Sequence, residues 1–531
     1  MVLPVWRRNR WQLWGLAGFA VIYPLLSAPE PYLNNLVKSR ALTAVALLLA
    51  GLLLVPVLHI LRPSTWGRAG RLSLGISAVL GVYAVILGGV RLESVAILLL
   101  LPVLALFLAQ PANSPWLTRP VRDVTVSLVV VVVATCFLSA HQYVALFGHP
   151  YRRTGLATFC ACVVVFLAGL RFLANRDDAR FMVRCLVLGS VPVALLALVQ
   201  FFDTSPFTAG FFTSLVRDPR PMGTLGQTNW FGTYLLLLFP FAVHWAVNER
   251  SWRWAGLAGL LYASLLVAQT RGAWVAALSF MLVHAWHLRR EWRPLAGLAL
   301  WFALLTAVLV PWNHRQILDR VGSFQDEAGL ALQGQAGTGS GRFSFWRYAL
   351  HHVPSRALLG SGLDTFGELG TRDLPAPVSK AHSVYLEYAV TIGLIGLCCW
   401  MAFLWYCFGR ASPTPGPLPW RFVLGTYWVQ GLFIHDTIQT WPLLWLLAAA
   451  AVAASRNRQA SDGSRHGCET VQGTVDRAIR AEDGEPRAEE SRPSADVGQQ
   501  PPNPNRCHRS IPPRTPGAVD TSRSAFAAWP G

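Results

Sequence analysis

Two titratable side chains interrupt an apolar segment toward the end of the chain. The segment 379–397 reads SKAHSVYLEYAVTIGLIGL and places His382 near its start and Glu387 five residues later. A neutral imidazole can accept a proton near physiological pH, so His382 could serve as a general base. The alternative is that His382 only packs at a helix boundary. Glu387 is the stronger signal, because a carboxylate inside a membrane span usually has a function or a charged partner.

The spacing of the two residues bears on how they could act together. On one regular helix Glu387 would lie about 7.5 Å deeper than His382 and about 140° further round the axis. The two side chains could not then share a close contact. We therefore expect Glu387 to support the site by pairing with an arginine from another segment, such as Arg220 or Arg271.

Two arginines, Arg220 and Arg271, stand in segments suited to an anion, and a third, Arg342, stands in the long loop. Arg220 lies in RDPRPMGTLGQTNWFG, residues 217–232, together with Gln227 and Asn229. Arg271 lies in AQTRGAW, between two apolar runs, and Arg342 follows the Gly-rich stretch 333–341. A guanidinium group can hold a phosphate with two parallel hydrogen bonds, and the start of a helix adds positive charge. The segments of Arg220 and Arg271 predict a cradle for a phosphorylated or hydroxyl-rich ligand.

Each of these segments also has an interpretation without chemistry. Residues 217–232 could simply lead into a helix that Thr228 or Asn229 caps. Arg271 could extend from a helix end to water. Arg342 could lie on the membrane surface with Trp346 and Arg347 in a short amphipathic helix.

The sequence offers no pattern for a metal or a cofactor. None of the nine cysteines has the Cys-x-x-Cys or Cys/His spacing of a zinc site. The Gly-rich stretch lacks the Lys-Ser/Thr that completes a Walker phosphate loop. The one Asp-Asp pair, at 177–178, is expected on the face opposite to His382. We therefore predict a metal-independent site without a cofactor.

The elements that must position these residues are membrane helices. The chain of 531 residues is 53% hydrophobic and only 14% charged, and apolar runs near 20 residues recur from about 12 to 455. Such a run can cross the hydrocarbon core of a bilayer, about 30 Å thick. Fourteen candidate spans can be placed, and several are short, so we expect about 12–14 transmembrane helices in an all-α polytopic membrane protein. They lie at 12–28, 41–61, 73–90, 93–109, 124–147, 155–174, 181–202, 229–248, 252–269, 272–288, 294–312, 382–408, 420–436 and 440–455.

The two ends of the chain differ from this pattern. The first apolar run, which ends LLSAPEP, resembles a secretory signal peptide, but with so many spans behind it we expect an uncleaved first helix. Residues 456–531 hold eleven arginines and ten acidic residues without apolar periodicity. We expect them to form a disordered cytoplasmic tail after a membrane domain at 1–455.

The charges of the loops predict the orientation. With the amino terminus in the cytoplasm and fourteen spans, the inner segments carry twenty arginines and the short outer loops eight basic residues. This is the bias that the positive-inside rule describes, so the net charge of +18 does not indicate nucleic-acid binding. The long loop at 313–381 and the segments of Arg220, Arg271 and His382 then all face away from the cytoplasm.

The order of these motifs resembles one family. GTLGQTNWFG precedes one span, TRGAW begins another, and a long outer loop with R-x-x-x-W and G-x-G leads to AHSVYLE and GLIG. This series, over about 200–450, is similar to the O-antigen ligase and polymerase superfamily, which includes protein O-oligosaccharyltransferases. Where ligases often show Asn-Pro-Asn or Gln-Pro-Asn, this chain has Gln-Thr-Asn at 227–229, and Ser383 follows the histidine where Asn is commoner.

The resemblance implies a glycosyltransferase. Such proteins move a glycan from an undecaprenyl-diphosphate carrier to lipid A core, a growing glycan or a protein hydroxyl, at the outer face of the bacterial cytoplasmic membrane. It implies that His382 activates the acceptor hydroxyl and that Arg220 and Arg271, with Arg342 as a further contact, bind the diphosphate. Ligase, polymerase and protein-glycosylating activities stay open.

Two other classes of protein share some of these features. A transporter of an anion or a lipid-linked sugar would also carry arginines and a glutamate near the membrane. Transporters commonly contain internal repeats with broken helices, and the two halves of this chain show no convincing self-similarity. A non-catalytic scaffold for envelope assembly is the third possibility.

Overall fold

The computed structural model describes most of the chain up to Arg456. The described residues are 10–27, 31–58, 68–89, 91–108, 117–202, 220–287, 289, 292–312, 322, 342–369, 379–409 and 419–456. The chain divides into two units, Met1–Arg465 and His466–Gly531. The predicted tail after residue 456 and most of the predicted loop at 313–381 lie outside the described residues.

The described residues form helices and no strand, which confirms the all-α prediction. The first eight are α1 (Arg10–Leu25), α2 (Pro31–Leu58), α3 (Arg68–Gly88), α4 (Leu92–Leu108), α5 (Arg119–Phe137), α6 (Gln142–Phe147), α7 (Leu156–Phe172) and α8 (Arg176–Phe202). Next come α10 (Thr228–Asn248), α11 (Trp252–Val267), α12 (Arg271–His287), α13 (Trp292–Trp312) and α15 (Arg342–His352). The last are α16 (Val384–Thr391), α17 (Gly393–Leu404), α18 (Trp420–Gly431) and an unlabelled helix, Trp441–Arg456.

The helices fit a membrane protein by length and composition. Five of them are long and apolar enough to cross a bilayer, and six described apolar helices are shorter. A helix satisfies its own backbone N–H and C=O groups, which hydrocarbon cannot do. Each predicted span overlaps an observed helix, but the predicted span at 382–408 is wrong in detail. It is broken into α16, α17 and a π-helical turn, Trp405–Gly409.

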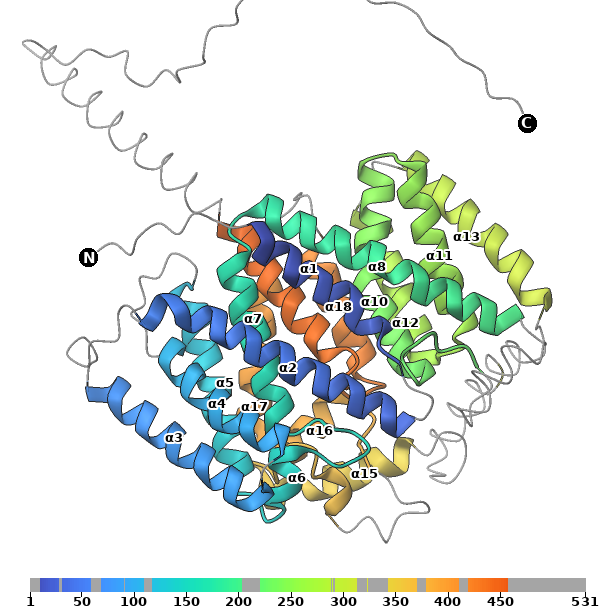
Figure 1. Ribbon diagram of the computed structural model, residues 1–531. Helices are drawn as coiled ribbons and strands as arrows, with labels where there is room; N and C mark the ends of the chain where they lie inside the picture. The colour runs from blue at the N-terminus through green and yellow to red at the C-terminus, as the bar shows by residue number, and fades with distance from the viewer. Residues whose placement is uncertain are drawn as a thin grey trace, which may run out of the picture. The chain divides into compact units, whose positions relative to one another are not determined.

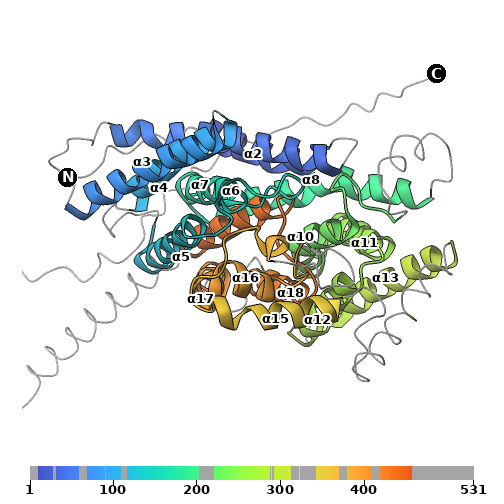
Figure 2. The same cartoon turned by 90° about the horizontal axis from the view of Figure 1, so that it is seen from below.

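The core lies around α7 and the last helix. Every residue of α7 from Leu156 to Leu170 is buried. Trp445 of the last helix packs its ring against Phe159, Phe166 and Phe403. A Cβ added at Gly169 would lie 2.6 Å from the Cβ of Ala449, so glycine and alanine let the two helices approach closely. Figure 2 shows α2, α3 and α4 along one side of this core and α12, α15, α17 and α18 along the other.

The loops gather at the two ends of the helices as the alternation of spans predicts. At one end, Asn34 donates a hydrogen bond to the carbonyl of Thr224, and Arg152 pairs with Asp364. Helices α6, α15 and α16 gather at this end, in the lower part of Figure 1. At the other end, the guanidinium of Arg456 donates to the carbonyl of Leu173 at 2.8 Å. Segments predicted to share a membrane face are thus neighbours.

Candidate active site

His382 does not belong to a helix. Helix α16 begins at Val384, and Ser383 is its N-cap residue. The backbone of His382 has φ 51°, a left-handed conformation that a residue with a side chain adopts only when its surroundings impose it. The helical geometry expected for His382 and Glu387 is therefore wrong, and what surrounds this segment must account for its shape.

The predicted span is broken after α16, and the long loop packs against this break. Gly393, between α16 and α17, has φ +71°, and a Cβ there would collide with the carbonyl of Leu358. The backbone N–H groups of Ser361 and Gly362 donate to the carbonyls of Val390 and Thr391. These carbonyls end α16 and would otherwise have no partner. The segment 357–362 of the long loop thus caps the broken helix.

A small apolar cluster joins α15 to the same segment. Ala349, Phe366, Ala381 and Val390 are buried against one another, with Phe345 and others packed around them. These residues come from α15, the end of the long loop and both sides of His382. The described part of the long loop and α16 therefore form one packed unit.

Asp364 is the centre of a buried charge network. Its side chain is fully buried and accepts from Arg152 Nε at 2.7 Å and from Lys380 Nζ at 2.9 Å. The backbone N–H groups of His149 and Thr154 donate to its second oxygen. Burial alone would raise the pKa of Asp364, but the charges of Lys380 and Arg152 hold it well below its usual range. The carboxylate is therefore ionised at neutral pH.

Glu387 extends this network toward His382. One carboxylate oxygen accepts from Lys380 Nζ at 2.8 Å, and the other accepts from the backbone N–H of Ala381 at 2.9 Å. The expectation that Glu387 pairs with Arg220 or Arg271 is therefore wrong. Burial lowers the pKa of Lys380, but the negative charges of Asp364 and Glu387 raise it by more than burial lowers it. The pKa of Lys380 is therefore above its usual value. Lys380 is a cation shared between two anions.

The imidazole of His382 lies between two aromatic rings. Its centroid is 5.8 Å from the ring of Phe345 and 5.2 Å from the ring of His435. Nδ1 of His382 and Nδ1 of His435 are both buried and have no hydrogen-bond partner among the described residues. Burial, together with the charges of Arg342 and Lys380, lowers the pKa of His382 to about 4. The ring is therefore neutral at pH 7, the form that can accept a proton.

The segment after α18 forms the remaining wall. Burial lowers the pKa of His435 and raises the pKa of its neighbour Asp436. Asp436 accepts from the hydroxyl of Tyr388 at 2.6 Å and from that of Tyr427 at 2.7 Å. These hydrogen bonds tie the segment of His435 to α16 and α18.

Arg220 and Arg271 flank a single turn. Nη1 of Arg220 lies 3.5 Å from the carbonyl oxygen of Gln269, and Arg271 begins α12 two residues later. A Cβ added at the next residue, Gly272, would lie 2.7 Å from the Cβ of Phe433. Phe433 stands two residues before His435, which contacts His382. The segment from Phe433 to His435 therefore lies next to both the turn that carries Arg271 and the imidazole of His382.

Gln227 and Asn229 stand at the start of α10. Gln227 is the N-cap residue and makes no side-chain capping bond. The hydroxyl oxygen of Thr228 is buried without a hydrogen-bond partner among the described residues. The backbone carbonyl of Asn229 accepts from the hydroxyl of Thr233 at 3.0 Å. The interpretation in which Thr228 or Asn229 caps this helix is therefore wrong.

A family model identifies the central part of the chain. Residues 255–401 match the model described as O-Antigen ligase. This match confirms the resemblance to the O-antigen ligase superfamily over these residues. The family indicates glycan transfer of the O-antigen ligase or polymerase type in a bacterial membrane. No curated protein matches the chain.

The matched region contains much of the candidate site. Arg271, Arg342, His382 and Glu387 lie inside it, whereas Arg220 precedes it. The described residues hold no group of three or more His, Cys, Asp or Glu side chains that could bind a metal ion. The charge network and the two neighbouring histidines are therefore the chemical groups to be explained.

Sequence patterns could have revealed part of this network. Asp364 stands in GSGLDTFGELG, a Gly-rich stretch that marks a tight backbone path. Lys380 stands two residues before His382 in a segment singled out for chemistry. Neither residue was predicted, because their pairing depends on Arg152, which is more than 200 residues away in the chain.

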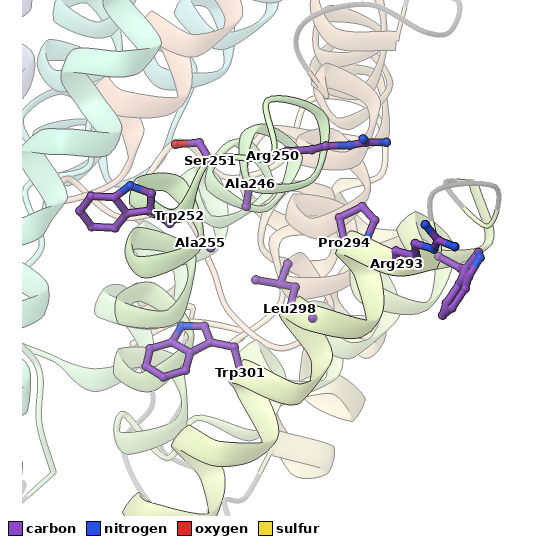
Figure 3. Close-up of a pocket in the computed structure, with 11 residues that line it drawn as sticks. Ala246, Arg250, Ser251, Trp252, Ala255, Arg293, Pro294, Leu298 and Trp301 are labelled. Carbon is purple, nitrogen blue, oxygen red and sulfur yellow. The ribbon is translucent and has the colours of Figure 1, made fainter.

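A well-formed pocket of the described residues lies at the other end of the helices. It has a volume of about 730 Å³ and is lined by residues of α10, α11 and α13. Figure 3 shows Arg250 and Arg293 at its edge and Leu298 and Trp301 on its α13 side. Its lining contains no histidine or acid. It therefore lacks a side chain that could act as general base at neutral pH.

Proposed function

We propose that this protein transfers a glycan from an undecaprenyl-diphosphate carrier to an acceptor hydroxyl at the outer face of the cytoplasmic membrane. The acceptor is lipid A core, a growing glycan or a protein. The observation that supports the proposal most directly is the neutral, buried imidazole of His382, bordered by segments that carry Arg220, Arg271 and Arg342. The family match supports transfer of a glycan over its transport.

The reaction follows from these groups. The acceptor hydroxyl gives its proton to the imidazole of His382 as its oxygen attacks the anomeric carbon of the donor glycan. The bond from that carbon to the diphosphate oxygen breaks, and undecaprenyl diphosphate leaves with the bonding electron pair. The negative charge that develops on the leaving group is stabilised by the guanidinium groups of Arg220, Arg271 and Arg342. In a partly dehydrated site these charges act more strongly than in water.

The low pKa of His382 has a cost and a benefit. An imidazole with a pKa of about 4 is a weaker base than a free one, but it is almost fully neutral over the physiological range. Arg342 contributes to this low value, and its charge is also suited to the donor diphosphate. We propose that donor binding offsets the charge of Arg342 and makes the imidazole more basic when the substrate is present.

The test is transfer by purified protein in proteoliposomes. A polyprenyl-diphosphate-linked glycan is supplied with lipid A core, free glycan or a serine-containing protein, and the products are separated by mass. The proposal predicts a glycosylated product with one acceptor class and release of polyprenyl diphosphate in equal amount. Donor consumption without release of the diphosphate, or movement of intact donor across the bilayer without a product, would contradict it.

A further inference from the structure

Three buried charges and the half-buried Arg152 link three distant parts of the chain next to His382. The chain of contacts runs from Arg152 to Asp364, from Asp364 to Lys380 and from Lys380 to Glu387, with distances of 2.7, 2.9 and 2.8 Å. The exposed fractions of the four side chains are 13%, 0%, 6% and 4%. Two cations and two anions balance one another.

Stability alone does not explain such a network. Removing a charge from water costs several kcal/mol, and well-packed apolar side chains are often as stabilising as a buried ion pair. What an ion-pair network adds is fixed geometry, because each charge demands its partner at a set distance and direction. Asp364 itself has φ 62°, a second left-handed residue in this unit. The network therefore holds the backbone in an arrangement that it would not adopt freely.

Glu387 applies this constraint directly to the peptide before His382. Its two carboxylate oxygens hold the side chain of Lys380 and the backbone N–H of Ala381, the two residues that precede the histidine. The backbone of Ala381 is thereby fixed from inside α16. His382 follows in its left-handed conformation with its ring between Phe345 and His435. A shift of Ala381 would move the imidazole with it.

We propose that Glu387, Lys380 and Asp364 are positioning residues that hold the imidazole of His382 against the acceptor hydroxyl. This proposal rests on the proposed role of His382 as general base. None of the three needs to contact the substrate, since each acts through the backbone or the side chain of its neighbour. Arg152 completes the network by fixing Asp364.

The network also contributes to the electrostatic environment of the His382 imidazole. The charged groups that face its ring are Arg342 from α15 and Lys380 from the preceding segment, while His435 after α18 is neutral. Both cations lower the pKa of His382. Loss of the Lys380 charge raises that pKa, so the imidazole becomes protonated, and inactive as a base, at a higher pH. A merely structural role of Lys380 would not move the pH dependence in this direction.

The first experiment measures transfer by Glu387→Gln and Glu387→Asp in proteoliposomes. Glutamine keeps the shape but puts an amide N–H₂ group against one of the two donors, so kcat should fall about tenfold to a hundredfold with little change in KM for the donor. Aspartate keeps the charge and should recover part of this loss. The matched control is Glu93→Gln, which breaks an ion pair with Arg153 at the same end of the helices and should keep kcat within about twofold.

The second experiment separates positioning from folding. Glu387→Gln is added to His382→Ala, and residual transfer is compared with that of His382→Ala alone. If Glu387 acts through His382, the double variant loses nothing further. A further loss, or wild-type kcat in Glu387→Gln alone, would overturn the positioning role. Full transfer by His382→Ala would instead overturn the proposed function.

The third experiment is the pH dependence of transfer by Lys380→Met. The acid limb should move to higher pH than in the wild type. If this single variant does not accumulate, Lys380→Met with Glu387→Gln removes one cation and one anion together and keeps the charge balance. An acid limb at the wild-type position in an accumulated variant would contradict the role of Lys380.

Discussion

Arg271 stands at the first position of α12, where its guanidinium adds to the positive end of the helix dipole. Arg220 reaches the same turn from the segment that precedes α10, so two guanidinium groups lie in one small region. A planar guanidinium can hold two phosphate oxygens at once, whereas a lysine ammonium acts as a point charge. The type of cation therefore matters here as well as its sign.

Replacement of Arg271 by lysine tests whether its guanidinium binds the donor phosphate through two hydrogen bonds. Arg271→Lys keeps the charge but loses the bidentate geometry, so kcat/KM for the lipid-linked donor should fall about tenfold or more. Arg91→Lys, at an exposed arginine at the same end, is the control and should behave as wild type. An equal effect of both substitutions, or none of either, would argue against a phosphate role for Arg271.

The residues that carry the site were only partly predictable. His382 and the arginines could be singled out because their side chains are costly near apolar segments and have evident chemistry. Lys380 could not, because a lysine in a loop is usually a solvated surface residue. Its burial follows from Asp364 and Glu387, and only the folded chain brings these two together.

At the scale of elements, the decisive feature is the break between α16 and α17. The apolar run from His382 to Phe408 predicts one long span, because periodicity shows neither where a helix stops nor what caps it. The break exists since Gly393 accepts φ +71° and the segment 357–362 supplies its N–H groups to the end of α16. The long loop therefore shapes the helix that follows it.

Gly393→Ala tests the break directly. The substitution puts a Cβ into the carbonyl of Leu358 at a left-handed position, which should lower stability by roughly 1–3 kcal/mol. Thermal unfolding in detergent would show this as a lower Tm, and transfer should fall with it because His382 precedes α16. Gly425→Ala in α18, where a new Cβ meets no atom within 4 Å, is the control. Equal Tm values for the two variants would contradict this account.

At the scale of the whole molecule, the all-α membrane fold could be predicted well from composition and apolar runs. Hydrocarbon thickness and backbone hydrogen bonding leave few alternatives to a bundle of helices. The alternation of spans also predicted which loops would be neighbours. Which end faces the cytoplasm rests on the distribution of arginines alone, so the orientation is a prediction.

Thiol labelling of single cysteines tests the orientation. In a cysteine-free variant of the full chain, Ser355→Cys should react with a membrane-impermeant reagent added outside intact cells, because Ser355 is exposed at the end that holds His382. Ser251→Cys, at the start of α11, should react only after permeabilisation. The reverse pattern would place the candidate site in the cytoplasm and would contradict the proposed function.

The most direct test of the central claim is transfer by His382→Ala, compared with His351→Ala, in proteoliposomes over a range of pH. His351 is an exposed histidine of α15 at the same end and is the matched control. A base must be neutral to act, so kcat/KM of the wild type for the donor, which reports the donor-free protein, should hold from pH 7 toward pH 5 and fall as the pH drops through about 4. His351→Ala should follow the wild type.

The account predicts that His382→Ala inserts and accumulates normally but loses transfer by about a hundredfold or more, as expected when a general base is removed. Transfer by His382→Ala at the wild-type rate and with the wild-type pH dependence would contradict it.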